Sequence, residues 1–164
     1  MSPQQKALVL PRQGNLELSF RSIPSPDAGQ LLVKIQSAAL NPFDYNITNT
    51  DYVSHYPAVL GMDIAGIVEE PGEGVHNFRK GDRVLAHGRF TDDFTAFQQY
   101  ALTAASFTAK IPASDSESFD SAATVPLGLD TAVVGLYGDQ FGARITPPLH
   151  GQSMPHKVTH CKLL

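Results

Sequence analysis

Near the start of the chain, hydrophobic and polar residues alternate in short runs, as they do in half-buried strands. Residues 6–10 and 16–20 are two such runs, and the turn-forming residues between them predict a β-hairpin. In residues 31–36 every second side chain is apolar, which predicts a third strand with one buried face. The chain therefore begins as β-structure.

A short helix is expected next, because Asn41 suits the N-cap position, the proline after it suits the first helical position, and Asp44 suits the first turn. Residues 59–70 then predict a strand that contains Gly61 and Gly66. Glycine inside a strand usually marks a bulge or the close approach of another backbone or of a ligand.

Further strands are predicted at residues 83–86, 97–102 and 107–111. Ser114 and Glu117 have the spacing of a capping box, which predicts a helix that begins there and runs toward Ala123. Residues 125–137 are apolar enough to predict a second helix that is buried on most sides.

Short strands at close spacing, with helices as minor inserts and at the end, predict a mainly β fold: a barrel or sandwich with a C-terminal helical extension. From about Leu149 the hydrophobic pattern has no period. We therefore expect a β domain over residues 1–125, a linker or helix over residues 126–148, and a divergent, disordered tail over residues 149–164.

Charge and composition exclude several classes of partner. The chain has 12 Lys and Arg against 16 Asp and Glu, and no basic cluster longer than Arg79 and Lys80, so neither nucleic acid nor an anionic membrane is expected to bind. No apolar stretch approaches the roughly 20 residues of a spanning helix. The single cysteine, Cys161, excludes an internal disulfide and a thiolate metal cage. We expect a cytoplasmic protein.

Ordered motifs carry a resemblance to a known family. Residues 59–68 read VLGMDIAGIV, residues 72–75 read GEGV, and residues 78–84 read FRKGDRV. With matching segments upstream and downstream, over about 130 residues, this order resembles the N-terminal GroES-like catalytic domain of the medium-chain dehydrogenase/reductase superfamily. The resemblance implies a partly open GroES-like β-barrel with short helices.

Members of that superfamily similar to alcohol dehydrogenase hold a catalytic zinc through a cysteine before the short helix and a Gly-His-Glu motif. Here the cysteine position falls on Asn41, and Met62 and Asp63 replace the histidine and the glutamate. A thioether and one carboxylate do not make the ligand set that zinc catalysis needs. The resemblance therefore implies the zinc-independent branch, with quinone oxidoreductases and enoyl reductases, and no metal site.

In that branch, NADPH delivers hydride to a carbon conjugated to a carbonyl, and the enolate is then protonated. The implied substrate is a small molecule, either a quinone or an enoyl carbonyl compound. Fungal trans-acting enoyl reductases of this branch serve polyketide synthases, so the resemblance alone implies such a synthase as a partner. Without zinc, the developing oxyanion needs placed hydrogen-bond donors, or the reaction depends on the orientation of the cofactor.

Candidate site residues follow from donor chemistry and from the resemblance, which places Thr131 beside the nicotinamide and Asn46 where relatives often carry a cofactor-contacting lysine. The candidate catalytic residues are Tyr45, Tyr52 and Thr131, and the candidate cofactor-binding residues are Asn41, Asp44, Asn46 and Thr131.

Each candidate also has a purely structural interpretation. Tyr45 and Tyr52 can be packing residues with a solvated hydroxyl. Asn41 can be only a helix cap, and Thr131 can bond the preceding helical turn. For Asp63 we expect satisfaction of backbone donors within the barrel rather than a catalytic role.

The cofactor domain of this superfamily is not found in the sequence. Gly135, Gly138 and Gly142 lack both the spacing and the strand-to-helix context of a dinucleotide-binding turn, and too few residues follow Pro148 for a βαβ unit of about 30 residues. We therefore expect that the Rossmann domain is absent, that the chain is truncated before it, and that the chain alone is inactive and binds no NADPH. The alternative is a non-catalytic GroES-like binding module.

The tail contains His156, His160 and Cys161, whose spacing is the minimum for metal capture. Nothing near these residues predicts a helix, so we expect a disordered terminus rather than a metal site.

Overall fold

The structure is a computed structural model, and it describes residues 3–50, 52–112 and 118–138. The chain divides into two compact units, Met1–Leu127 and Gly128–Leu164. The first unit contains every strand of the described residues. No helix in these ranges is both long enough and apolar enough to cross a membrane.

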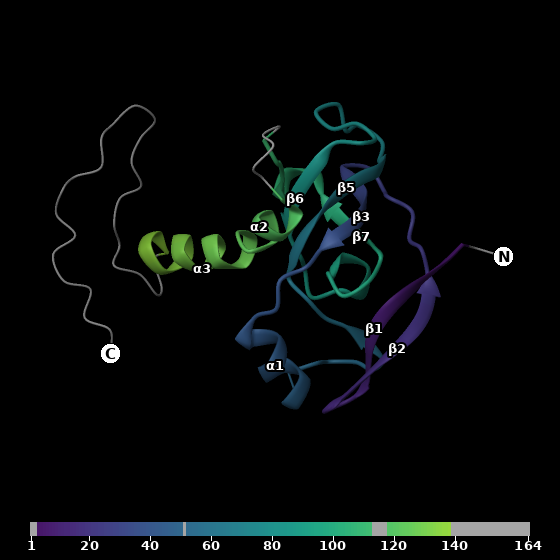
Figure 1. The fold of residues 1–164 in the computed structure, drawn as a ribbon, viewed down its shortest axis with the longest axis vertical. Coiled ribbons are helices and arrows are strands. Elements are labelled where there is room, and N and C mark those ends of the chain that lie inside the picture. Colours follow the sequence, from purple (N-terminus) through teal and green to yellow (C-terminus); the bar gives the residue numbers. More distant parts are fainter. Residues whose placement is uncertain (1–2, 51, 113–117, 139–164) are drawn as a thin grey trace, which may run out of the picture. The chain divides into compact units, whose positions relative to one another are not determined.

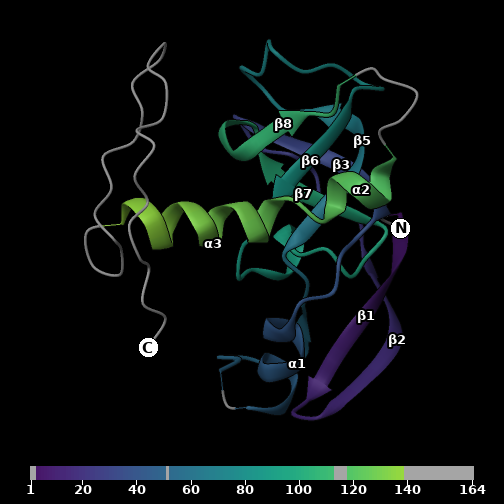
Figure 2. The same ribbon diagram turned by 60° about the vertical axis from the view of Figure 1, so that its left-hand side comes forward.

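Two antiparallel sheets form the first unit (Figures 1 and 2). The smaller sheet has the order β2–β1–β4, from β1 (Gln4–Arg12), β2 (Asn15–Ser22) and β4 (Ala58–Val59). The larger sheet has the order β7–β3–β5–β6–β8, from β3 (Gln30–Ser37), β5 (Asp63–Pro71), β6 (Arg83–His87), β7 (Tyr100–Ala104) and β8 (Thr108–Lys110). The predicted mainly β class and the N-terminal hairpin are confirmed.

The two sheets are joined through the segment that leads into β7. Leu8 N–H donates to the Phe97 carbonyl at 2.8 Å, and Gln99 N–H donates to the Lys6 carbonyl at 3.2 Å. On its other side the segment accepts from β3, because Ile35 N–H donates to the Gln99 carbonyl at 2.9 Å. The sheets therefore curl into the partly open barrel that the family resemblance implies.

Strand β5 is the centre of the core because it is buried on both faces. One face packs into a cluster made by the larger sheet and its adjoining loops: Leu31, Val33, Ile64, Val68, Phe78, Val84, Ala86, Ala96 and Ala101. The other face is covered by helix α2 (Phe119–Ala123), where Ala65 packs with Ala122 and Ala123. Burial on both faces explains why the start of β5 is almost continuously apolar rather than alternating.

The predicted strand over residues 59–70 is wrong in one respect, because it is two strands. Gly61 lies between β4 and β5 with φ +97°, a conformation that favours glycine, and an added Cβ would lie 2.6 Å from the Phe97 ring. Gly66 lies inside β5, where an added Cβ would come within 2.3 Å of the Lys34 carbonyl oxygen. The predicted close approach of another backbone is therefore confirmed at Gly66.

Helix α1 (Pro42–Asn49) begins after Asn41, as predicted. The tip of the β1–β2 hairpin holds its other end: Gly14 N–H donates to the Thr48 carbonyl, and the Gln13 amide donates to the Asn49 carbonyl, both at 2.7 Å. Figures 1 and 2 both show α1 beside this hairpin.

The other helical predictions need correction. The capping box at Ser114 and Glu117 lies outside the described residues, and α2 begins later, with Ser118 as the N-cap that accepts from Ser121 N–H at 3.0 Å. Short 3-10 turns η1 (Asp92–Phe94) and η2 (Ala105–Phe107) were not predicted. Helix α3 (Pro126–Tyr137) is present, but Pro126 is its only buried residue. The prediction that α3 is buried on most sides is therefore wrong for its described residues.

Replacing Gly66 with alanine is expected to destabilise the chain by about 3 kcal/mol, the upper end of the usual cost of overpacking, because the colliding atom belongs to the backbone of β3. Chemical denaturation measures this loss. Gly128→Ala is the matched control, since nothing lies within 4 Å of its added Cβ. Equal midpoints for both variants would contradict the close β3–β5 approach.

Candidate functional site

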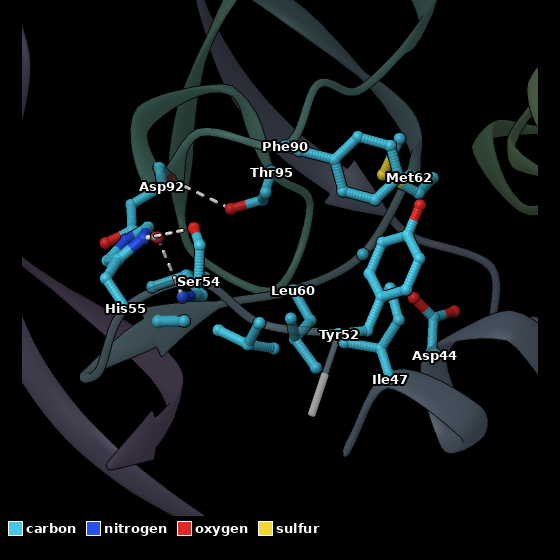
Figure 3. A pocket seen from close by; sticks show the side chains of 14 residues that line it. Asp44, Ile47, Tyr52, Ser54, His55, Leu60, Met62, Phe90, Asp92 and Thr95 are labelled. Atoms are coloured by element: carbon cyan, nitrogen blue, oxygen red, sulfur yellow. Dashed lines mark hydrogen bonds and ion pairs between the residues drawn. The ribbon is translucent and has the colours of Figure 1, made fainter. Parts of the chain in front are cut away.

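A pocket with an empty volume of about 540 Å³, part of it open to solvent, lies in the first unit between α1, β4 and the loop that contains η1. Figure 3 shows Tyr52 and Phe90 on one side of it and Ser54, His55 and Asp92 on the other. The lining residues are Asp44, Ile47, Tyr52, Val53, Ser54, His55, Ala58, Val59, Leu60, Gly61, Met62, Phe90, Asp92 and Thr95.

One wall of the pocket is aromatic. The rings of Tyr52 and Phe90 have centroids 5.9 Å apart, and each packs against Phe43 with centroid distances of 5.8 and 5.7 Å. Tyr52 is 63% exposed and Phe90 is 59% exposed. Large aromatic surfaces left open beside a pocket are typical of sites that bind flat, apolar ligands.

The opposite wall is polar and centres on Asp92. Its carboxylate accepts from Val59 N–H at 3.2 Å and lies 3.4 Å from His55 Nε2. The Ser54 hydroxyl lies 3.4 Å from His55 Nδ1, and the Thr95 hydroxyl donates to the Asp92 carbonyl at 2.8 Å. Hydroxyl and imidazole groups therefore face an apolar wall across one pocket.

Asp44 reaches the pocket from α1 and is only 6% exposed. Burial away from water is the largest influence and raises the pKa of the Asp44 carboxyl, and the negative charge of Asp63 acts in the same direction. The Asn41 N–H, which donates to Asp44 Oδ2 at 2.8 Å, opposes this effect but does not cancel it.

The structure brings together only some of the predicted site residues. Asp44 and Tyr52 line the pocket. Tyr45 and Asn46 lie on the exposed face of α1, and neither lines the pocket. Thr131 is an exposed residue of α3 in the second unit. The roles assigned to these residues stay predictions.

Asn41 does more than begin a helix. Its backbone N–H donates to Asp44, and its side-chain amide donates to Asp63 Oδ2 at 2.7 Å. Asp63 is 1% exposed, and its other oxygen accepts from Leu127 N–H at 2.7 Å. Asp63 satisfies a backbone donor, but this donor belongs to the start of α3 rather than to the barrel as expected. The amide of Asn41 is a second donor that sequence reasoning missed.

The positions implied for zinc ligands do not fit the metal. The Asn41 amide nitrogen has no lone pair to offer while it donates to Asp63, and both oxygens of Asp63 already accept N–H groups. His87 pairs with Asp63 in the β5–β6 ladder, but these two side chains alone do not form a zinc site. Within the described residues, no group of three or more His, Cys, Asp or Glu side chains could hold a metal ion.

Several pocket residues were not identified from the sequence. Ser54 and His55 lie in an irregular segment, and Asp92 begins the short turn η1, where neither period nor motif indicates that a side chain faces a pocket. Phe90 follows the GDRV motif, but its position gives no sign that it packs against Phe43 and Tyr52. These residues meet only through the long-range folding of the barrel.

Comparison with known proteins identifies the family. The model of the alcohol dehydrogenase GroES-like domain matches residues 27–113. The chain belongs to this family. It is 41% identical over 141 residues to the dehydrogenase pigH of Monascus ruber, a match that covers 79% of this chain and 38% of that protein. It is 35% identical over 162 residues to the trans-enoyl reductase tazE of Aspergillus terreus, covering 90% and 52%.

Comparison with solved structures agrees with this family assignment. The quinone oxidoreductase from Coxiella burnetii superposes with a TM-score of 0.68 at 28% identity, over 80% of this chain and 46% of that one. A mycobacterial protein in complex with NADPH superposes with a TM-score of 0.67 at 28% identity, over 79% and 40%. The chain thus spans about half, or less, of the length of each of these proteins.

Asp44→Asn gives a test of the buried carboxyl by its pH dependence. Because the pKa of Asp44 is higher in the folded chain than its ordinary value of 3.8, the folded chain binds this proton more tightly. The stability that this bound proton contributes is complete below the pKa of Asp44 in the unfolded chain. It is lost as the pH rises through the pKa of Asp44 in the folded chain. The asparagine oxygen can still accept from Asn41 N–H.

The stability of Asp44→Asn relative to the wild type is therefore expected to increase from acid to neutral pH, as measured by urea unfolding across that range. Asp27→Asn, at an exposed aspartate, controls for the removal of one negative charge. A difference for Asp44→Asn that stays flat or falls with pH would show that the carboxyl is not penalised by burial.

Proposed function

We propose that this chain carries the substrate-binding part of a zinc-independent, NADPH-dependent cytoplasmic oxidoreductase that reduces a quinone or an α,β-unsaturated carbonyl compound. The aromatic wall carries the proposal: Tyr52 and Phe90 present ring faces and edges beside a pocket with an apolar floor. A trans-enoyl reductase and a quinone oxidoreductase among the similar proteins support this substrate class.

The binding mode follows from the two walls. A flat conjugated substrate packs against the rings of Tyr52 and Phe90, where it buries apolar area and excludes water. The Tyr52 hydroxyl is the donor proposed for the carbonyl oxygen, which gains negative charge as the conjugated carbon is reduced. Asp44 holds the start of α1 through its bond to Asn41 and so keeps this wall in place.

NADPH supplies hydride in this chemistry, and a similar mycobacterial structure contains it. The described residues contain no glycine-rich turn between a strand and a helix in the pattern that cradles a pyrophosphate. We propose further cofactor contacts, outside such a turn, at Asn41, Asp44, Asn46 and Thr131. A polyketide synthase stays a proposed partner. The proposed catalytic domain ends at residue 125, and the proposed linker or helix after it ends at residue 148.

Binding tests the substrate class with the chain as it exists. The chain is titrated with a soluble p-quinone and with an enoyl thioester, and amide chemical shifts report the site. Both probes are expected to shift the amide resonances of residues in the aromatic wall. Phe90→Ala is expected to weaken binding by about tenfold, because it removes one well-packed ring. Phe107→Ala is the control, because Phe107 is also exposed but does not line the pocket.

Measuring the affinity for the saturated thioester of the same length distinguishes the proposed reductase pocket from a non-catalytic GroES-like binding module. A reductase pocket is expected to favour the flat, conjugated thioester over the flexible, saturated one. Equal affinity for both, or equal weakening by Phe90→Ala and Phe107→Ala, would contradict the proposal.

A further inference from the structure

The Asp63 carboxylate joins two parts of the first unit through hydrogen bonds to both of its oxygens, and we call this pair of bonds the clasp. Asp63 Oδ2 accepts from the Asn41 amide, at the N-cap of α1, and Asp63 Oδ1 accepts from the backbone N–H of Leu127, both at 2.7 Å. Leu127 is the second residue of α3 and the last residue of the first unit. One side chain therefore holds the start of two helices that are far apart in sequence.

The local backbone explains how Asp63 reaches both helices. Met62 lines the pocket (Figure 3), whereas Asp63 is not among the lining residues. Adjacent side chains of an extended segment point to opposite sides, which directs Asp63 away from the pocket. A buried carboxylate needs donors for both oxygens, and the first N–H groups of a helix need acceptors from outside the helix. Asp63 satisfies both requirements at once.

Asn41 is suited to this clasp because it has two donors in fixed positions. Its backbone N–H donates to Asp44 at 2.8 Å, and its side-chain amide donates to Asp63 at 2.7 Å. A carboxylate only accepts hydrogen bonds, so the amide nitrogen of Asn41, rather than its oxygen, must face Asp63. The two buried acids are thus held by one residue between them.

We propose that Asp63 is a positioning residue: through hydrogen bonds to both of its carboxylate oxygens it fixes the N-cap of α1 against the start of α3. The support for this role is that both oxygens of Asp63 accept N–H groups, one from the residue before α1 and one from the start of α3. This inference does not depend on which substrate the pocket binds.

Exchanging the two partners tests the clasp. Asn41→Asp places a carboxylate against Asp63, so the clasp predicts a lower midpoint of urea unfolding, by roughly 1 M. Aspartate is as good an N-cap as asparagine, so a residue that only caps α1 would lose nothing. Adding Asp63→Asn to Asn41→Asp restores both bonds, because the amide introduced at position 63 donates to the carboxylate introduced at position 41, and the amide oxygen accepts from Leu127 N–H. The double variant is expected to recover most of the loss.

Asn46→Asp is the matched control, since it adds the same charge on the exposed face of the same helix. Its midpoint is expected to stay within the range of ordinary surface substitutions. An Asn41→Asp midpoint equal to that of Asn46→Asp, or a double variant no more stable than Asn41→Asp alone, would overturn the proposal.

Hydrogen exchange gives a readout that does not depend on a variant that folds. In the wild type, Leu127 N–H is expected to exchange at least about tenfold more slowly than in an unstructured chain, because it donates to a buried carboxylate. The protection should disappear in Asn41→Asp if that variant folds, and return in the double variant. An unprotected Leu127 N–H in the wild type would refute the clasp on its own.

Discussion

Two buried carboxylates next to the start of α1 impose the constraint on which this site depends. Asp44 and Asp63 are 6% and 1% exposed, and their negative charges repel each other. Such a pair is tolerated only when N–H donors replace the lost water. Asn41 supplies a donor to each acid, one from its backbone and one from its side chain, and Leu127 N–H completes Asp63. The positions of α1 and of the start of α3 follow from these bonds.

The pocket is a consequence of that arrangement. Helix α1 contributes Asp44 and Ile47 to it, and the segment that follows α1 contributes Tyr52 and the polar pair Ser54 and His55. The opposite end of α1 is held by the tip of the β1–β2 hairpin, so the helix is fixed at both ends. A pocket wall on a helix held in this way is preorganised, which the proposed zinc-independent site needs in order to orient a substrate.

Local patterns predicted the fold well where they reflect local physics. The hairpin, the strand over residues 31–36 and the capped helix at Asn41 were predicted because turn chemistry, side-chain alternation and capping act over a few residues. The partly open barrel was predicted from the family resemblance rather than from local patterns. The errors have longer-range causes. The strand over residues 59–70 breaks because Gly61 must pass the Phe97 ring. Of the described residues of α3, only Pro126 is buried. Of the predicted site residues, Asp44 and Tyr52 line the pocket, and their roles stay predictions. His55, Phe90 and Asp92 also line it but were missed, because only tertiary structure brings them together.

The most direct measurement of the central claim is the scalar coupling across the hydrogen bond from Leu127 N–H to the Asp63 carboxylate, recorded by NMR on the isotope-labelled wild-type chain at neutral pH. A cross peak between the Leu127 nitrogen and the Asp63 side-chain carboxyl carbon is the expected result. The backbone bond from Ile111 N–H to the Arg83 carbonyl, at 2.9 Å, is the internal reference. A clear reference peak with no peak between Leu127 and Asp63 would contradict the claim that this carboxylate holds the site together.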